Sequence, residues 1–394
     1  MYNQKAYELG ANGSCIRELY AYGRQRAALI GDENVFDFTQ GNPSNPTPKK
    51  VEETVQSLMA DMNPLELHGY TSAVGDPAAR QAIADDLNAR FDAGASADEL
   101  FLCCGTTPAL AAVFGALTVP GAQIVALAPF FPEYRPLAEG AGASFVVVPP
   151  DIPDFQIPMG ALEAALTEHT VAVIVNSPNN PAGTVYTEKT LRALAQLLEE
   201  KSRQYGHPIY IVADEPYREL TYDGVQTPFI PNIYPNTVVC YSYSKSLTLA
   251  GERIGYVYVP KQAQDSKALY AAVSGTARAI GHICAPSLWQ KVIARCAHLR
   301  PDMTAYDKNR RALYEGLTAA GYEVAKPQGA FYLFVKAPDG DAMAFAERAK
   351  NMDIILVPGN DFGCSAYCRL CYCVSYEKLQ RSLPRFRELI ESYR

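Results

Sequence analysis

The 394-residue chain has no run of basic residues, no internal repeat and no low-complexity segment. Its net charge is −7, so we expect no nucleic acid and no anionic membrane as partner. The first ten residues, MYNQKAYELG, lack a basic region followed by an apolar core, and we therefore expect no secretory signal. The ten cysteines are then expected to be the reduced thiols of a cytoplasmic protein and not a disulfide scaffold.

Charged residues are also missing from Leu100 to Pro132, a stretch long enough to span a membrane. Four prolines and three glycines interrupt this stretch, however. We expect buried elements instead, namely a strand over Phe101–Cys104, a helix over Pro108–Leu117 and a strand over Gln123–Leu127. The sequence therefore predicts no membrane-spanning helix here.

What the chain does contain is an alternation of helices with short, continuously apolar strands from about residue 50 to residue 285. Runs such as VAVIV and IYIVAD are typical of strands that are covered on both faces. The pattern predicts an α/β fold whose large domain is a mostly parallel sheet covered by helices, followed by a smaller α+β domain. We place the large domain at 46–285 and the small domain at 1–45 with 286–394.

Polar or reactive residues follow four of the predicted strands. These are Gly105–Thr107 after FLCC, Asn176–Asn180 after VAVIV, Asp214 after IYIVA, and Ser242–Lys245 at the end of TVVCYSY. Ligands of parallel sheets bind outside the carboxyl ends of the strands, so four such loops predict one shared crevice. Lys245 stands between two serines at the end of a buried strand, where it is either a loop lysine reaching water or a desolvated, nucleophilic amine.

An amine, a carboxylate and an arginine in this pattern suit pyridoxal phosphate chemistry. Lys245 lies 31 residues after Asp214 (245 − 214) and eight before Arg253 (253 − 245). The amine would bind the cofactor's aldehyde, and the carboxylate would keep the pyridine nitrogen protonated so that the ring accepts electrons. The arginine fork would hold the phosphate.

Five segments resemble, in family order, motifs of the class I aminotransferases (aspartate aminotransferase-like) of the fold-type I pyridoxal phosphate enzymes. They are DFTQGNPSNPTP, GYTSAVGDPAARQAIA, NSPNNPAGT, ADEPYREL and SYSKSLTLAGERIGY, within a similarity that runs from about Asp37 to Tyr376. One such motif is weak, whereas five in order are highly specific. The resemblance implies a fold-type I transferase with pyridoxal 5′-phosphate as cofactor. It also implies amino-acid metabolism, with an amino group passing between an α-amino acid and a 2-oxo acid by a ping-pong mechanism.

The resemblance also implies roles for residues around the cofactor ring. Lys245 is expected to hold the cofactor and move the substrate proton, and Asp214 to pair with the pyridine nitrogen. Tyr217 and Asn180 match donors to the phenolic oxygen, and Phe131 matches an aromatic that stacks on the ring. Taken singly, Asp214 is equally well a helix cap, Asn180 a turn residue, and the aromatics core residues.

Further matches concern the phosphate and the substrate. The expected phosphate ligands are Gly105, Thr106, Thr107, Ser242, Arg253 and Tyr70. Tyr70 matches a residue that reaches the site of the neighbouring subunit, which implies a homodimer with shared active sites. Arg369 matches the arginine that clamps the substrate α-carboxylate, opposite Gly41 and beside Asn180. A guanidinium in the apolar strand CRLCYCV needs such a partner.

Several alternatives remain open at this point. A carbon–sulfur β-lyase would share the fold and the lysine, and a regulator without turnover is disfavoured because no DNA-binding module is present. Cys364, Cys368 and Cys371 have the spacing CxxxCxxC of iron–sulfur ligands, but we interpret them as core thiols and expect no metal. Thr107 stands in a loop where some aspartate-specific relatives carry a lysine, and Arg278 is an uncertain candidate for binding a second substrate carboxylate.

Overall fold

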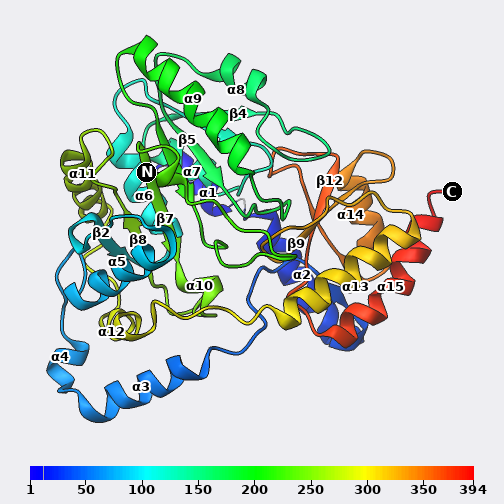
Figure 1. Ribbon diagram of the computed structural model, residues 1–394. Helices are drawn as coiled ribbons and strands as arrows, with labels where there is room; N and C mark the ends of the chain where they lie inside the picture. Colours follow the sequence, from blue (N-terminus) through cyan, green and yellow to red (C-terminus); the bar gives the residue numbers. More distant parts are fainter. Residues whose placement is uncertain (12) are drawn as a thin grey trace.

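The computed structural model describes residues 1–11 and 13–394. Its centre is a seven-stranded sheet with the order β2-β8-β7-β6-β5-β3-β4 (Figure 1). The strands are β2 (Leu100–Cys103), β3 (Gln123–Leu127), β4 (Ser144–Val148), β5 (Thr170–Asn176), β6 (Tyr210–Asp214), β7 (Thr237–Ser242) and β8 (Gly255–Tyr258). Strand β8 is antiparallel to β2 and β7, and the other pairings in this sheet are parallel. The mostly parallel sheet predicted from the sequence is therefore confirmed.

The carboxyl ends of β2, β5, β6 and β7 meet at one edge of this sheet. Asn176 at the end of β5 is level with Asp214 at the end of β6. Cys103 and Ser242, at the ends of β2 and β7, both pair with Gly255 of β8, which runs between these two strands. The register thus brings the loops that follow these four strands together.

Helices cover both faces of the sheet, because neighbouring strand residues face different cores. Val125 packs with one core and Ile124 with the other, which explains why these strands are continuously apolar. The first core is covered by α3 (Lys49–Asp61), α4 (Pro64–His68), α5 (Pro77–Phe91), α8 (Met159–Ala165), α9 (Glu188–Tyr205) and α12 (Ser287–Cys296). The second is covered by α6 (Thr106–Leu117), α7 (Tyr134–Gly140) and α11 (Ser266–Ala279).

A smaller antiparallel sheet with the order β11-β12-β9 lies beside the large one (Figure 1). Its strands are β9 (Tyr332–Lys336), β11 (Val357–Pro358) and β12 (Tyr367–Cys371). Residues of α13 (Thr304–Ala320), α14 (Ala342–Lys350) and α15 (Tyr376–Glu391) pack in the same core. A short parallel pair joins β1 (Phe36–Asp37) to β10 (Ile354–Ile355), so the N-terminal segment packs with the C-terminal one. The domain boundaries remain a prediction. Helix α12 lies after residue 285, in the segment assigned to the small domain, but it packs against α3 and α5, which cover the large sheet.

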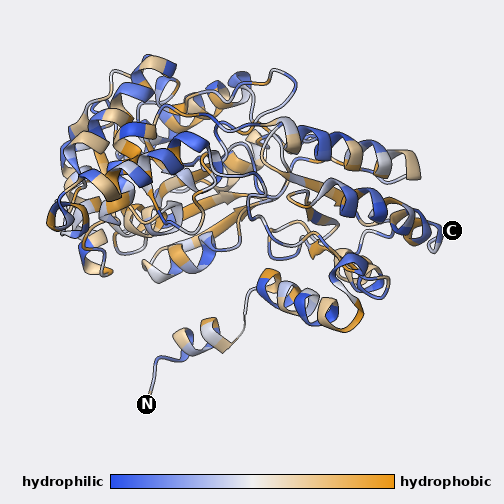
Figure 2. Ribbon diagram, turned by 90° about the horizontal axis from the view of Figure 1, so that it is seen from below, coloured by the Kyte–Doolittle hydropathy of each residue, from blue (hydrophilic) through white to orange (hydrophobic). Residues whose placement is uncertain are grey.

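The N-terminal helices are α1 (Gln4–Ala11) and α2 (Cys15–Ile30). Figure 2 shows α1 standing away from the body of the molecule, and none of its residues is buried. Short 3-10 helices lie at Asp32–Asn34, Ala97–Glu99 and Ile230–Asn232. Within the described ranges, the structure contains no helix that combines the length and the apolar character needed to cross a membrane.

Candidate active site

A cavity of about 340 Å³ opens at the edge where the four strands end. Each of the four loops predicted to converge contributes to its wall. The contributions are Thr106 and Thr107 after β2, Asn176 and Asn180 after β5, Asp214, Pro216 and Tyr217 after β6, and Ser244, Lys245, Ala250 and Arg253 after β7. Gly41, Phe131, Tyr332, Arg369 and Ile16 complete it. The crevice expected from the sequence is therefore present.

Lys245 lies in the single turn α10 (Tyr243–Ser246) directly after β7. Strand β7 ends at Ser242, before the end of the run TVVCYSY, because the Ser242 side chain caps this turn by accepting from the Ser244 N–H. Lys245 Nζ donates a hydrogen bond of 2.7 Å to the carbonyl of Gly41. Burial lowers the pKa of this amine, which favours the neutral, nucleophilic form.

Asp214 is buried, and its two carboxylate oxygens have different surroundings. The Tyr134 hydroxyl donates to Oδ2, whereas Oδ1 has no hydrogen-bond partner among the described residues. Asn176 Nδ2 donates to the Asp214 carbonyl at 2.8 Å and fixes the strand end. Burial raises the pKa of Asp214 to about 7, so a cation at Oδ1 would stabilise the carboxylate.

Arg369 is 2 % exposed, and its guanidinium is only partly satisfied by the protein. Its Nη2 donates to the Thr39 carbonyl at 2.6 Å and its Nη1 to Asn180 Oδ1 at 3.1 Å, and its guanidinium lies 4.8 Å from the centroid of the Tyr332 ring. The buried Nε has no acceptor within the described ranges, and no acidic side chain there forms an ion pair with this guanidinium. A bound carboxylate is the partner that this buried charge calls for.

Tyr217 and Gly41 are linked to Arg369 through Tyr332. The hydroxyls of Tyr217 and Tyr332 lie 2.8 Å apart. A Cβ at Gly41 would collide with the Tyr332 hydroxyl, so glycine is required at this close approach. Gly41 was expected to offer its N–H to the substrate, and the contact present here is its carbonyl accepting from Lys245.

The expected phosphate residues form a cradle at the start of α6. Thr106 and Thr107 open this helix, whose first N–H groups suit an anion. Arg253 Nη1 donates to Ser244 Oγ at 3.2 Å, and its Nη2 lies 2.5 Å from the position that a Cβ on Gly105 would take. Ser242 is buried beside this cradle with its Oγ 2.7 Å from Ser244 Oγ, and its phosphate contact remains a prediction.

This cradle predicts a specific effect of Gly105→Ala. Gly105 has φ +92°, so alanine adds backbone strain of about 1–3 kcal/mol as well as a contact with Arg253. Gly121→Ala is the matched control, because Gly121 has φ +83° and open space around its Cα. Both variants should melt at a lower temperature, but only Gly105→Ala should weaken pyridoxal phosphate binding, measured by fluorescence titration. Equal affinities of the two variants would contradict the assignment of this cradle.

Tyr70 is 91 % exposed and does not belong to the cavity wall formed by its own chain. Its role in a neighbouring subunit's site remains a prediction. Phe131 does line the cavity, close to Asp214, and its stacking role likewise remains a prediction.

Sequence reasoning missed Tyr134, Thr39, Tyr332 and Ser244. Tyr134 contacts Asp214, which is 80 residues away in the sequence, and Thr39 contacts Arg369, which is 330 residues away. A local sequence pattern gives no signal for such contacts. Ser244 was within reach, because it adjoins the predicted lysine in the same turn.

The three cysteines with iron–sulfur spacing are buried in apolar surroundings. Cys368 and Cys371 belong to the core around the small sheet, whereas Cys364 packs in a separate cluster with Phe155 and Phe334. In residues 1–11 and 13–394, no group of three or more His, Cys, Asp or Glu side chains is placed to hold a metal ion. The iron–sulfur alternative is not favoured.

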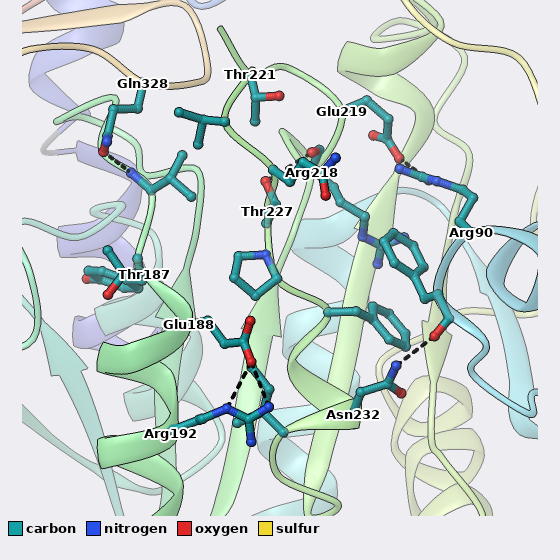
Figure 3. Close-up of a pocket in the computed structure, with 18 of the residues that line it drawn as sticks. Arg90, Thr187, Glu188, Arg192, Arg218, Glu219, Thr221, Thr227, Asn232 and Gln328 are labelled. Carbon is teal, nitrogen blue, oxygen red and sulfur yellow. Dashed lines mark hydrogen bonds and ion pairs between the residues drawn. The ribbon is translucent and has the colours of Figure 1, made fainter. Parts of the chain in front are cut away.

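A second, larger cavity of about 920 Å³ lies between α9, α5 and the segment after Tyr217 (Figure 3). Each of the four arginines that line it is in an ion pair. Arg192 pairs with Glu188 and Arg90 with Glu219, each at 2.6 Å, and Arg218 pairs with Glu215 and Arg300 with Asp86, each at 2.5 Å. The residues that suit the expected chemistry line the smaller cavity instead. The smaller cavity is therefore the candidate active site.

Several known proteins that resemble this chain are named aminotransferases. The family model described as "Aminotransferase class I and II" matches residues 33–386. A crystal structure of an aminotransferase from Eubacterium rectale is 49% identical and superposes with a TM-score of 0.98, covering 100% of this chain and 99% of that one. The aspartate aminotransferase structure from Thermotoga maritima is 27% identical with a TM-score of 0.87, covering 99% and 100%. The aspartate/prephenate aminotransferase of Thermus thermophilus is 31% identical over 90% of each chain.

These matches cover most of the chain and agree with the site. The protein belongs to the class I and II aminotransferases, and its activity is transamination. Neither the β-lyase nor the iron–sulfur alternative is favoured by these relatives.

Proposed function

We propose that the cavity binds pyridoxal 5′-phosphate and uses it to transfer the amino group of an α-amino acid. Three observations support the fit: the free Oδ1 of Asp214, the desolvated amine of Lys245, and the cradle of Gly105 and Arg253. The single observation that carries the proposal is that Asp214, Lys245 and Arg253 all line one cavity. The cofactor, when bound, supplies an aldehyde for covalent attachment and a ring that accepts electrons.

The chain's own residues have separate tasks in this reaction. Asp214 Oδ1 holds a proton at the ring nitrogen as an ion pair, which its burial strengthens. Lys245 would hold the cofactor's aldehyde and, when the substrate amine replaces it there, would act as the base that carries a proton from the substrate Cα to the cofactor's C4′ carbon. Its lowered pKa leaves a larger neutral fraction for this work. Arg253 and the first N–H groups of α6 hold the phosphate.

Arg369 defines the substrate as an α-amino acid and its partner as a 2-oxo acid. Its free Nε and its cavity-facing position suit a bidentate carboxylate. The cations among the described residues lining the cavity are Lys245, Arg253 and Arg369, and each has a task above. The Thermotoga relative is named for aspartate, which has a second carboxylate. Binding that carboxylate here would need a cation that is not one of these three. Arg278, which is exposed, is the candidate.

A half-reaction screen tests this proposal. The enzyme loaded with pyridoxal phosphate is mixed with single amino acids, and conversion of the cofactor to pyridoxamine phosphate is followed by absorbance and chromatography. Conversion by one or more α-amino acids is expected. The proposal fails if amines lacking a carboxylate convert the cofactor as well as their parent amino acids do, or if nothing does.

We also propose a homodimer in which Tyr70 completes the partner subunit's phosphate site. Tyr70 is exposed, as are the large apolar side chains of Leu65, Ile280 and Ile283, and exposed apolar side chains suit an interface. Tyr70→Phe and Lys245→Ala, each impaired alone, should regain activity when mixed and reassembled, because one site of the hybrid has both native residues. A monomer in sedimentation, or no recovery after verified mixing, contradicts this arrangement. The cytoplasmic location and a biosynthetic role remain predictions.

A further inference from the structure

Tyr134 contacts the Asp214 carboxylate, although it does not itself line the cavity. It is the first residue of α7 and is 1 % exposed. Its hydroxyl donates to Asp214 Oδ2, while Oδ1 has no hydrogen-bond partner within the described ranges and Asp214 forms part of the cavity wall. One oxygen is thus held by the protein and the other is left for a ligand.

The position of Tyr134 is fixed by the turn that also places Phe131. The Tyr134 N–H donates to the Phe131 carbonyl at 3.1 Å, and the two rings meet edge to face with centroids 5.7 Å apart. Phe131 is the residue expected over the face of the cofactor ring. A single turn therefore places Phe131 in the cavity wall and Tyr134 against the Asp214 carboxylate.

The hydrogen bond also affects the charge of Asp214. The titratable groups that face this carboxylate are Tyr134 from α7, Cys240 from β7, and Glu215 and Tyr217 from the segment after β6. Burial raises the pKa of both tyrosines and of the Cys240 thiol, so these three stay neutral, and the negative charge of Glu215 opposes ionisation of Asp214. Among these neighbours, the Tyr134 hydroxyl is the donor that favours the carboxylate form.

We propose that Tyr134 is a positioning residue for transamination: its hydroxyl holds Asp214 Oδ2 so that Oδ1 faces the ring nitrogen as a carboxylate oxygen. The proposal rests on the cofactor assignment made above. Without the hydroxyl, Asp214 would hold its own proton more tightly and would no longer keep the ring nitrogen protonated near neutral pH. The pKa of Asp214, already raised by burial to about 7, would rise further in Tyr134→Phe.

The test measures cofactor affinity in Tyr134→Phe as a function of pH. At neutral pH we expect pyridoxal phosphate to bind about 10- to 100-fold more weakly than in the wild type, the usual effect of one hydrogen bond to a charged group. Affinity should recover as the pH rises, because the carboxylate re-forms above its raised pKa. An analogue with a C–H group in place of the ring nitrogen should bind equally to both proteins, since it has no nitrogen for Asp214 to serve.

Tyr234→Phe is the matched control. Tyr234 is also 1 % exposed, and its hydroxyl donates to a backbone carbonyl, that of Ile209, at 2.7 Å. This variant loses a buried phenol hydrogen bond of the same kind but should keep the wild-type dependence of affinity on pH. If Tyr134→Phe is too unstable to purify, 3-fluorotyrosine at position 134 is used instead. Its more acidic hydroxyl is a stronger donor to Asp214, so the curve of cofactor affinity against pH should shift to lower pH, opposite to the shift expected for Tyr134→Phe.

Two outcomes overturn the proposal, and they differ. If Tyr134→Phe and Tyr234→Phe show the wild-type affinity curve while the wild type prefers pyridoxal phosphate to the analogue, Tyr134 is merely structural and the cofactor assignment stands. If the wild type itself binds the analogue as well as pyridoxal phosphate at every pH, the role of Asp214 fails, and the proposal for Tyr134 fails with it.

Discussion

Lys245→Ala is expected to remove both turnover and the absorbance band of the covalently bound cofactor. Loss of a positioned proton-transferring group alone costs about 10²- to 10⁴-fold in rate, and loss of the covalent attachment adds to this. The fold should survive, because Lys245 is a partly buried residue whose single hydrogen bond goes to the Gly41 carbonyl. Turnover is measured with the best amino acid from the half-reaction screen, and folding by the melting temperature.

Lys261→Ala is the control for this prediction. Lys261 Nζ also donates to a glycine carbonyl, that of Gly94, at 2.9 Å, but it lies outside the active-site cavity. Its replacement should leave turnover and absorbance as in the wild type. Turnover by Lys245→Ala within about tenfold of the wild type would show that another residue moves the proton.

The second large effect is expected for Arg369→Lys. Lysine keeps the charge but cannot form the two parallel N–H···O bonds that a guanidinium offers a carboxylate. We expect kcat/KM for α-amino acids to fall by about 30- to 1000-fold, corresponding to about 2–4 kcal/mol of lost transition-state binding. Cofactor affinity should change little, because the phosphate cradle is formed by Arg253 and the start of α6 and not by Arg369.

Arg310→Lys controls for the general cost of replacing a buried arginine. Arg310 is 5 % exposed and pairs with Asp223 and Asp307 in the smaller core region. The Arg310→Lys variant should be less stable than the wild type, and its kcat/KM should change by no more than a few-fold. If Arg369→Lys lowers kcat/KM no more than Arg310→Lys does, the substrate carboxylate is bound elsewhere.

Much of the large sheet could be predicted because parallel strands leave a strong local signal. The predicted strand over Gln123–Leu127 coincides with β3, since it is a short apolar run between helices. The reversal of β8 could not be predicted, because a strand covered on both faces is apolar whichever way it runs. Helix α11 was missed although Leu269, Val273 and Ala277, its buried residues, recur every four positions.

The site was predictable where motif and strand end coincide. Asp214, Asn180 and Lys245 follow strands that the pattern located, and the sheet register then brings them into one cavity. Contacts between residues far apart in the sequence could not be predicted, because nothing in the sequence near Tyr134 indicates that its hydroxyl contacts Asp214. A contribution from Tyr70 to another subunit is beyond what one chain's geometry can test.

The most direct test of the central claim is to locate the lysine that carries the cofactor. The wild-type protein is loaded with pyridoxal phosphate, reduced with borohydride so that the covalent link becomes permanent, digested, and mapped by mass spectrometry. We predict the label on the peptide that contains Lys245, and none there when the protein is first converted to its pyridoxamine form with an amino acid. A label on Lys267 or any other lysine, or none at all, would contradict the account.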